Sequence, residues 1–144
     1  MAQPAARWFT PPQVGDIVWC RFPQNRIPGP GPKSRPALVL SIGEANGCTV
    51  ALVAYGTSRK IDRLYKGEFA ILPSDGDAFA VSGLSYPTKF DLGATFELDY
   101  NDIWFDVPSV APHGQTPKLG VLHPSLLRRA AAAARAAVNP GLKK

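Results

Sequence analysis

Apolar side chains recur at every second position across residues 89–98, and most of the positions between them are polar or charged. Alternation with a period of two residues is typical of a strand with one face in the core and the other in solvent. The stretch therefore predicts a half-buried strand whose polar face carries charge. Its apolar positions are Phe90, Leu92, Ala94, Phe96 and Leu98, and its polar positions are Lys89, Asp91, Thr95 and Glu97.

Shorter apolar runs bounded by glycine and proline predict further strands. Residues 35–41 and 49–55 are expected to form a hairpin whose turn centres near Ala45. A first strand at residues 14–22 is expected to be largely buried, with Trp19 in the core. Other strands are predicted at residues 67–72 and 118–122, and residues 103–105 form another short apolar piece.

Residues 23–34 interrupt this pattern with four prolines and two glycines. Because proline cannot donate a hydrogen bond to a ladder, the composition predicts a protruding, semi-stiff loop without strand pairing.

One helix is predicted near the C-terminus, beginning at Pro124 and Ser125 and stopped by residues 139–141. Leu127, Ala131, Ala134 and Val138 share one face of this helix. Six or seven closely spaced strands and one helix favour a mainly β fold, a small barrel-like antiparallel sheet with the helix packed on it. We expect residues 14–139 to form a single domain, preceded by a flexible lead-in at residues 1–13 and followed by a tail at residues 140–144.

Composition supports one soluble folded domain, because 45% of the 144 residues are hydrophobic and 19% are charged. The net charge is +5, but six basic residues and no acidic ones follow Pro117, so the first 117 residues carry −1. The high overall pI is therefore weak support for nucleic-acid binding, and local basic clusters matter more.

Cysteine and histidine content points to no cofactor and no metal. The two cysteines lie in apolar runs and are expected to stay reduced, and the two histidines have no partners at zinc-site spacing. The first residues lack the apolar core of a secretory leader, and no apolar run approaches the roughly 18 residues of a membrane span. A cytoplasmic protein without membrane contact is expected.

A guanidinium and a hydroxyl are expected to converge at the open end of the predicted hairpin. With the turn near Ala45, Arg35 lies opposite roughly Tyr55, and Thr57 follows about 7 Å further along the ladder at ~3.4 Å per residue. We place the candidate site at this pair.

In order and spacing, several segments resemble the MazF/PemK (Kid) family of toxin endoribonucleases of toxin-antitoxin modules. Each segment alone is weakly specific, and the ordered set covers most of residues 14–138. The segments are Gly15-Asp16-Ile17-Val18-Trp19, the proline-rich loop, Ser34-Arg35-Pro36-Ala37-Leu38-Val39-Leu40-Ser41, Thr57-Ser58 and Thr88-Lys89-Phe90-Asp91.

The resemblance implies an SH3-like barrel of the CcdB/PemK type, a homodimer, a cognate antitoxin, and metal-independent cleavage of single-stranded RNA at a short sequence. In the family, the arginine of the Arg-Pro pair and the threonine after the third strand are catalytic, which implies these roles for Arg35 and Thr57. Lys89 and Asp91 match further catalytic residues of the PemK/Kid branch, although that branch has arginine at the position of Lys89. Residues 95–117 are longer than the family leads us to expect.

Metal-free RNA cleavage uses the substrate's own 2′-hydroxyl as the nucleophile, so the site must move two protons and neutralise charge on phosphorus. Both histidines lie beyond the predicted site strands, which leaves Asp91 as the candidate base and an arginine or lysine as the candidate acid. Arg35 is assigned mainly to stabilising charge in the transition state, because its planar fork suits phosphate oxygens. Thr57 is expected to donate a hydrogen bond to the same phosphate.

RNA contacts are expected from basic residues near this site, where lysine and arginine interleave with Tyr65. An ordinary solvated loop is the alternative for this cluster, and a solvated ion pair is the alternative for Lys89 and Asp91. For Arg35 the alternative is a surface arginine at the start of a strand, and for Thr57-Ser58 it is a turn whose hydroxyls cap backbone groups. The candidate RNA-binding residues are Arg26, Lys33, Ser58, Arg59, Lys60 and Arg63.

Two other functions remain open from the sequence. A non-catalytic module on the same barrel could bind a protein target such as gyrase, or RNA without cleaving it. A degenerate domain of a phage or mobile element is the third possibility. The basic C-terminal helix is expected to be a solvated face, or alternatively a docking site for an acidic antitoxin tail.

Overall fold

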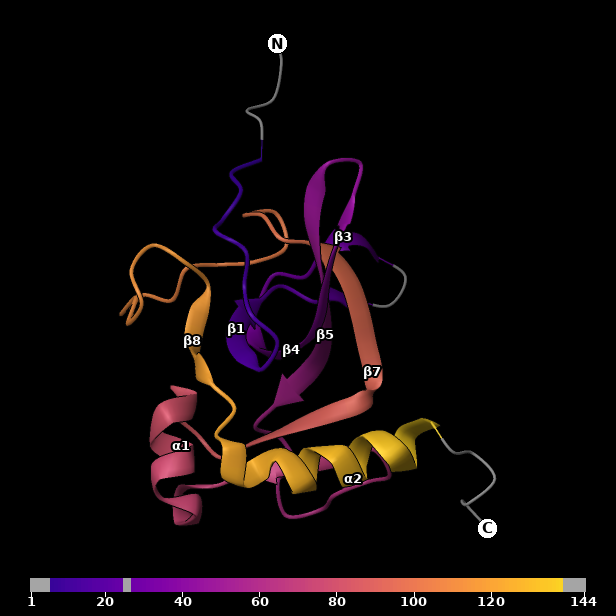
Figure 1. The fold of residues 1–144 in the computed structure, drawn as a ribbon, viewed down its shortest axis with the longest axis vertical. Helices are drawn as coiled ribbons and strands as arrows, with labels where there is room; N and C mark the ends of the chain where they lie inside the picture. Colours follow the sequence, from indigo (N-terminus) through magenta and orange to yellow (C-terminus); the bar gives the residue numbers. More distant parts are fainter. Residues whose placement is uncertain (1–5, 25–26, 139–144) are drawn as a thin grey trace.

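A computed structural model describes residues 6–24 and 27–138, and Figure 1 shows its arrangement. Most of the strands form one six-stranded antiparallel sheet in the order β6-β7-β5-β4-β1-β8, and β2 pairs with β3 in a separate ribbon. The strands are β1 (Asp16–Cys20), β2 (Pro23–Gln24), β3 (Ile27–Pro30), β4 (Arg35–Ala45), β5 (Cys48–Thr57), β6 (Glu68–Ile71), β7 (Thr88–Asp99) and β8 (Lys118–Val121). The helices are η1 (Pro73–Asp75), α1 (Asp77–Ser82), η2 (Pro124–Leu126) and α2 (Leu127–Val138).

The predicted mainly β fold with a C-terminal helix is confirmed. The barrel is not closed by strand pairing, because the edge strands β6 and β8 are not neighbours in the six-stranded sheet. Figure 1 shows α2 lying across one end of the sheet, with α1 beside it. Leu126 and Ala133 are buried there, whereas Leu127, which belongs to the predicted face, is 55% exposed. The face of the helix that packs on the sheet is therefore shifted by one residue from the predicted face.

The β4–β5 hairpin turns at Asn46 and Gly47, whose φ angles are +55° and +78°. Two positive φ values in a two-residue loop match the right-handed twist of the flanking strands, which explains the Asn-Gly pair. The predicted turn at Ala45 was therefore wrong. A register shift between Val39 and Ser41 then moves the pairing back by one residue, so that Ala37 faces Tyr55.

The proline-rich segment does pair, which corrects the prediction of a loop. Pro23 lies opposite Pro30 and Gln24 opposite Ile27 in the β2–β3 ribbon. Proline is tolerated on edge strands, and in a two-stranded ribbon both strands are edges. Gly31 N donates a hydrogen bond to Phe22 O at 3.0 Å and so joins the two residues that flank the open end of the ribbon.

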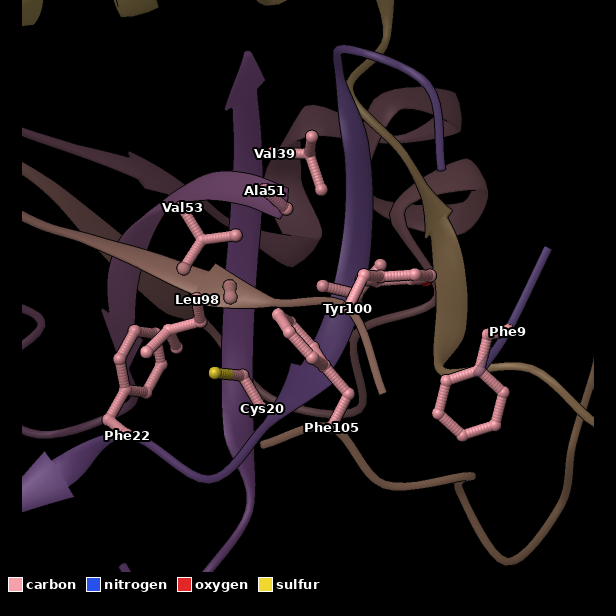
Figure 2. Packing of buried hydrophobic residues seen from close by; sticks show 11 residues of the cluster. Phe9, Cys20, Phe22, Val39, Ala51, Val53, Leu98, Tyr100 and Phe105 are labelled. Atoms are coloured by element: carbon pink, nitrogen blue, oxygen red, sulfur yellow. The ribbon is translucent and has the colours of Figure 1, made fainter. Parts of the chain in front are cut away.

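Two buried clusters lie on opposite faces of the strongly bent sheet. Figure 2 shows the first core cluster, in which Cys20 lies among Phe22, Leu98 and Phe105. The first core cluster is Phe9, Val18, Cys20, Phe22, Ala37, Val39, Ala51, Val53, Leu98, Tyr100 and Phe105. The second core cluster is Ile17, Leu38, Ala54, Phe69, Ile71, Ala78, Leu84, Phe90, Leu126 and Ala133.

Strand β7 serves both clusters, so the prediction of one buried face along it was wrong. Its register against β5 jumps between Ala54, which faces Thr95, and Tyr55, which faces Asp91. The residues in between bend the strand, as Figure 1 shows, because a bulge redirects the chain. Phe90 therefore packs in the second core cluster, whereas Leu98 packs in the first.

Helix α1 was not predicted, because a six-residue helix that follows a Pro-Ser-Asp-Gly turn signal is too short to show helical periodicity. It positions the segment that leads into β7. Gly83 ends it with a φ of +71°, and a Cβ at this position would lie 1.9 Å from Leu119 O. Glycine is therefore required where α1 meets β8.

Candidate active site

The ends of β4 and β5 are locked together beside the predicted pair. Gly56 packs so closely that a Cβ there would lie 2.5 Å from Pro36 O and 2.7 Å from Phe90 Cε1. Since Ala37 faces Tyr55, continuing this register places Arg35 opposite Thr57. The expected pairing of Arg35 with Tyr55 was wrong by two residues, and the actual register brings Arg35 and Thr57 closer together.

A cavity of about 940 Å³ is lined by Arg35 and Thr57 together with their neighbours Ser34 and Ser58. The opposite walls come from β1, α1, β8 and the segments 83–88 and 108–113. They are largely apolar, and they include Trp19, Tyr86, Val110, His113 and Leu119. The structure thus brings Arg35 and Thr57 to one hollow that is wide enough for part of a nucleic-acid strand.

The Arg35 side chain is half-buried and has no hydrogen-bond or ion-pair partner in residues 6–24 and 27–138. Two other arginines differ: Arg21 Nη2 lies 3.1 Å from Asp106 Oδ1, and Arg129 Nη1 lies 3.0 Å from Asp75 Oδ2. Because a guanidinium carries five donors, Arg35 can bind an oxyanion in the cavity without giving up a protein contact.

Thr57 holds the start of the loop after β5. Its Oγ1 accepts a hydrogen bond from the backbone N of Arg59 at 3.1 Å. The oxygen acts there as an acceptor, so the hydroxyl proton can be donated elsewhere. Thr57 can therefore donate to an anionic group beside Arg35.

Lys89 lies on the same cross-strand row, opposite Thr57 in β7. Its ammonium is committed elsewhere, because Nζ donates to Glu68 Oε1 and to Arg63 O, both at 2.9 Å. The side chain is only 3% exposed and lies 5.0 Å from the centre of the Tyr65 ring. Lys89 does not line the cavity with Arg35 and Thr57.

Asp91 lies opposite Tyr55, two residues along β7 from Lys89. Its Oδ1 accepts a hydrogen bond from Gly93 N at 2.8 Å and so shapes the bend of the strand. Asp91 is half-buried and is also absent from the cavity lining. The structure therefore separates the four predicted catalytic residues into two at the cavity and two beyond it.

Most of the predicted RNA-binding residues are exposed and lie close in sequence to the strand ends that carry Arg35 and Thr57. Ser58 lines the cavity, Arg59, Lys60 and Arg63 are exposed on the loop after β5, and Lys33 is exposed just before Ser34. Arg26 lies outside the described residues. Lys33 precedes Ser34 and Arg59 follows Ser58, so an exposed basic residue adjoins the cavity lining at each of the two strand ends.

The cysteines lie apart from this site, and both are free thiols. Burial raises the pKa of Cys20, which stays protonated inside the first core cluster. Across residues 6–24 and 27–138, no group of three His, Cys, Asp or Glu side chains is placed to hold a metal ion. None of the helices in the described part of the chain is long and apolar enough to cross a membrane.

Comparison with protein families gives a match over residues 13–101 to the PemK-like, MazF-like toxin of type II toxin-antitoxin system. The chain belongs to this toxin family. The matched residues include β4 and β5, which carry the cavity residues Arg35 and Thr57. The resemblance seen in the sequence is therefore confirmed.

The toxin fold also resembles a solved structure, described as an endoribonuclease in complex with its cognate antitoxin from mycobacterial species. The TM-score is 0.55 at 18% identity, with 92% of this chain and 98% of the other chain covered. At this identity the likeness shows the shared fold. No curated protein matches the chain.

Sequence reasoning missed most of the wall of this toxin's cavity, including Trp19, Tyr86 and His113. Trp19 was expected in the core, but it is half-buried and lines the cavity. His113 lies beyond the predicted site strands in the sequence, yet it also lines the cavity. His113 belongs to the long segment after β7, most of which lies beyond the residues matched to the family. This segment has no hydrophobic periodicity that would predict its position beside the cavity.

Proposed function

We propose that this toxin is an endoribonuclease that cleaves single-stranded RNA, such as mRNA, at a short sequence. The observation that carries this proposal is the uncommitted guanidinium of Arg35 beside Thr57 in one open cavity, in a chain of a toxin family. The neighbour of similar fold, an endoribonuclease, supports the same activity.

In the proposed reaction the 2′-hydroxyl of the substrate attacks the adjacent phosphorus without a metal ion. Arg35 binds the non-bridging phosphate oxygens and stabilises the charge that grows on them in the transition state. Thr57 donates its hydroxyl proton to the same phosphate while its oxygen stays fixed by Arg59 N. Electrostatic positioning therefore supplies most of the rate.

RNA is proposed to follow the exposed basic residues into the cavity. Arg59, Lys60, Arg63 and Lys33 flank the site and can contact phosphates on either side of the scissile one. Tyr86 is 69% exposed at the cavity wall, where it can stack on a base.

Lys89 and Asp91 are proposed to act by positioning. The Lys89 ammonium joins Arg63 O to Glu68 and so holds the basic loop against β7. Asp91 fixes the bend of β7 through Gly93 N. The direct catalytic roles implied by the resemblance stay predictions for these two residues.

A cognate antitoxin is proposed to inhibit the toxin by covering the cavity, and a homodimer is proposed as the active form. The type II family supports an antitoxin partner, and so does the neighbour, which is described in complex with its cognate antitoxin. The homodimer rests on the family resemblance alone. The exposed Arg128 and Arg135 of α2 offer a basic surface to an acidic antitoxin segment.

The test incubates the purified protein with a diverse pool of single-stranded RNA in EDTA and maps the new 5′ ends. We expect cleavage at a short motif that leaves a 2′,3′-cyclic phosphate, and a loss of about 10³-fold in Arg35→Ala with unchanged thermal melting. Arg7→Ala, which removes an exposed arginine outside the cavity lining, is the matched control and should cleave like the wild type.

Failure of the wild type to cut any RNA in the pool would contradict the nuclease proposal. RNA binding without cleavage, or capture of a protein such as gyrase that depends on Arg35, would then support the non-catalytic binding module.

A further inference from the structure

The segment between β7 and β8 is built into the wall of the cavity. At its start, Asp106 Oδ2 accepts a hydrogen bond from Ser34 Oγ at 3.1 Å, and Asp106 Oδ1 lies 3.1 Å from Arg21 Nη2. At its end, Pro117 O accepts from Trp19 N at 2.9 Å. Both anchors are next to site residues, since Ser34 precedes Arg35 and Trp19 lines the cavity.

Between these anchors the chain forms two consecutive tight turns that carry His113. Ala111 N donates to Pro108 O at 2.9 Å, and Gly114 N donates to Ala111 O at 3.1 Å. Ala111 and Gly114 have φ angles of +49° and +85°. These turns hold His113 in the cavity wall, so its presence there follows from a defined backbone path.

Cleavage through the 2′-hydroxyl needs a group that accepts a proton near neutral pH. The titratable groups that line the cavity are Arg35 from β4, Tyr86 from the segment before β7, and His113. The lining residues from β1, α1 and β8 are not titratable, and none of the described lining residues is a carboxylate. The arginine and tyrosine side chains are poor proton acceptors near neutral pH, whereas the free nitrogen of a neutral imidazole can take up a proton.

We propose that His113 is the general base of this toxin, taking the proton from the attacking 2′-hydroxyl. The inference rests on the proposed endoribonuclease activity and assigns the role that the sequence had given to Asp91. Asp91 is less suited to it, because it lies outside the cavity lining and its Oδ1 already accepts from Gly93 N.

The step balances without a co-reactant. The imidazole nitrogen accepts the proton of the 2′-hydroxyl while the 2′-oxygen forms a bond to phosphorus. The bond from phosphorus to the 5′-oxygen breaks, and its electron pair leaves with that oxygen, which takes a proton from solvent. The imidazolium then returns its proton to water, leaving a 2′,3′-cyclic phosphate and a 5′-hydroxyl.

The test measures cleavage of a short RNA that carries the mapped motif, as kcat/KM between pH 5 and pH 9. We expect His113→Asn to lower kcat/KM by about 10²-fold at neutral pH and to remove the fall in rate on the acid side of the wild-type profile. Added imidazole should partly restore His113→Ala. His123→Asn is the matched control, because His123 lies outside the cavity lining and asparagine can keep its capping bond to Ser125 N.

The outcomes separate this inference from the proposed function. Cleavage by His113→Asn at the wild-type rate, with the acid limb intact and with Arg35→Ala inactive, would overturn the role of His113 alone. A slow His113→Asn that keeps the wild-type pH profile, together with a His113→Ala that imidazole does not restore, would also overturn it. A wild type that cuts no RNA would overturn both proposals.

Discussion

Arg35 and Lys89 are two cations on one cross-strand row, and the fold treats them in opposite ways. Continuing the β4–β5 register places Arg35 opposite Thr57, and Thr57 faces Lys89 across the β5–β7 ladder. Arg35 lines an open cavity with no partner among the described residues, whereas Lys89 is 3% exposed and bonded to Glu68 and Arg63 O.

This difference shows that position in a motif does not decide what a cation does. A guanidinium with unsatisfied donors beside a cavity is available to a ligand. A buried ammonium whose charge is neutralised by a carboxylate is part of the packing, and exchanging it mainly changes stability. Substitutions that exchange these two behaviours test the comparison directly.

The largest effect is expected from Lys89→Met, which leaves the nearly buried Glu68 carboxylate without a cation and with a hydrogen bond from Tyr65 N. The free energy of unfolding should fall by about 3 kcal/mol, the usual cost of removing one partner of a buried ion pair. Urea unfolding measures it. The double variant Lys89→Met/Glu68→Leu should recover much of the loss, and a single variant as stable as the wild type would break the comparison.

Arg35→Lys should affect activity and leave stability unchanged. A lysine keeps the charge but loses the planar fork, so we expect a fall in kcat/KM of about 10²-fold, equivalent to about 2.7 kcal/mol. RNA cleavage and thermal melting, measured on the same preparation, check both halves. A drop in melting temperature instead of activity would mean that Arg35 is structural, like Lys89.

The smallest effect is expected from the partly exposed ion pair of Asp75 and Arg129, which sharpens the contrast with the buried pair. The hydrogen bond from Arg129 lowers the pKa of Asp75 below its ordinary value of 3.8. The stabilisation is therefore complete above the unfolded pKa and is lost as the pH falls through the folded pKa. Asp75→Asn should cost about 1 kcal/mol at pH 7 and nothing once the wild-type carboxylate is protonated.

Unfolding of both proteins in urea at pH 7 and at about pH 2 measures this dependence. The difference between wild type and Asp75→Asn should shrink at the lower pH, because protonation removes the charge that Arg129 binds. A constant difference would assign the stabilisation to the hydrogen bond that Leu72 N donates to Asp75.

Local patterns predicted most of the strands and the C-terminal helix, because the hydrophobic period of a strand or helix depends only on residues close together in the sequence. The same patterns failed where the chain changes face. The alternation across residues 89–98 looked uniform, yet the bulge between Asp91 and Thr95 sends Phe90 and Leu98 to different clusters. A bulge adds residues without breaking an apolar-polar alternation, so the period cannot reveal it.

The candidate site divides in the same way. Arg35 and Thr57 were predicted to meet because they end two strands of one hairpin, and a hairpin is a local structure. Tyr86 and His113 come from segments that pass over the cavity from far along the chain. Their distances from Arg35 depend on long-range anchors such as Ser34 to Asp106, which no spacing in the sequence records.

The sequence by itself determined the hairpin, the family motifs and the two residues at its open end, since turn chemistry and strand alternation act over a few residues. Only the tertiary structure decided which cation is free, because a charge is neutralised by whichever carboxylate the fold brings beside it. It also decided which side chains share the cavity with Arg35. Burial and solvation depend on the packing of the whole chain, and they distinguish Arg35, which is available to a ligand, from Lys89, which is part of the packed structure.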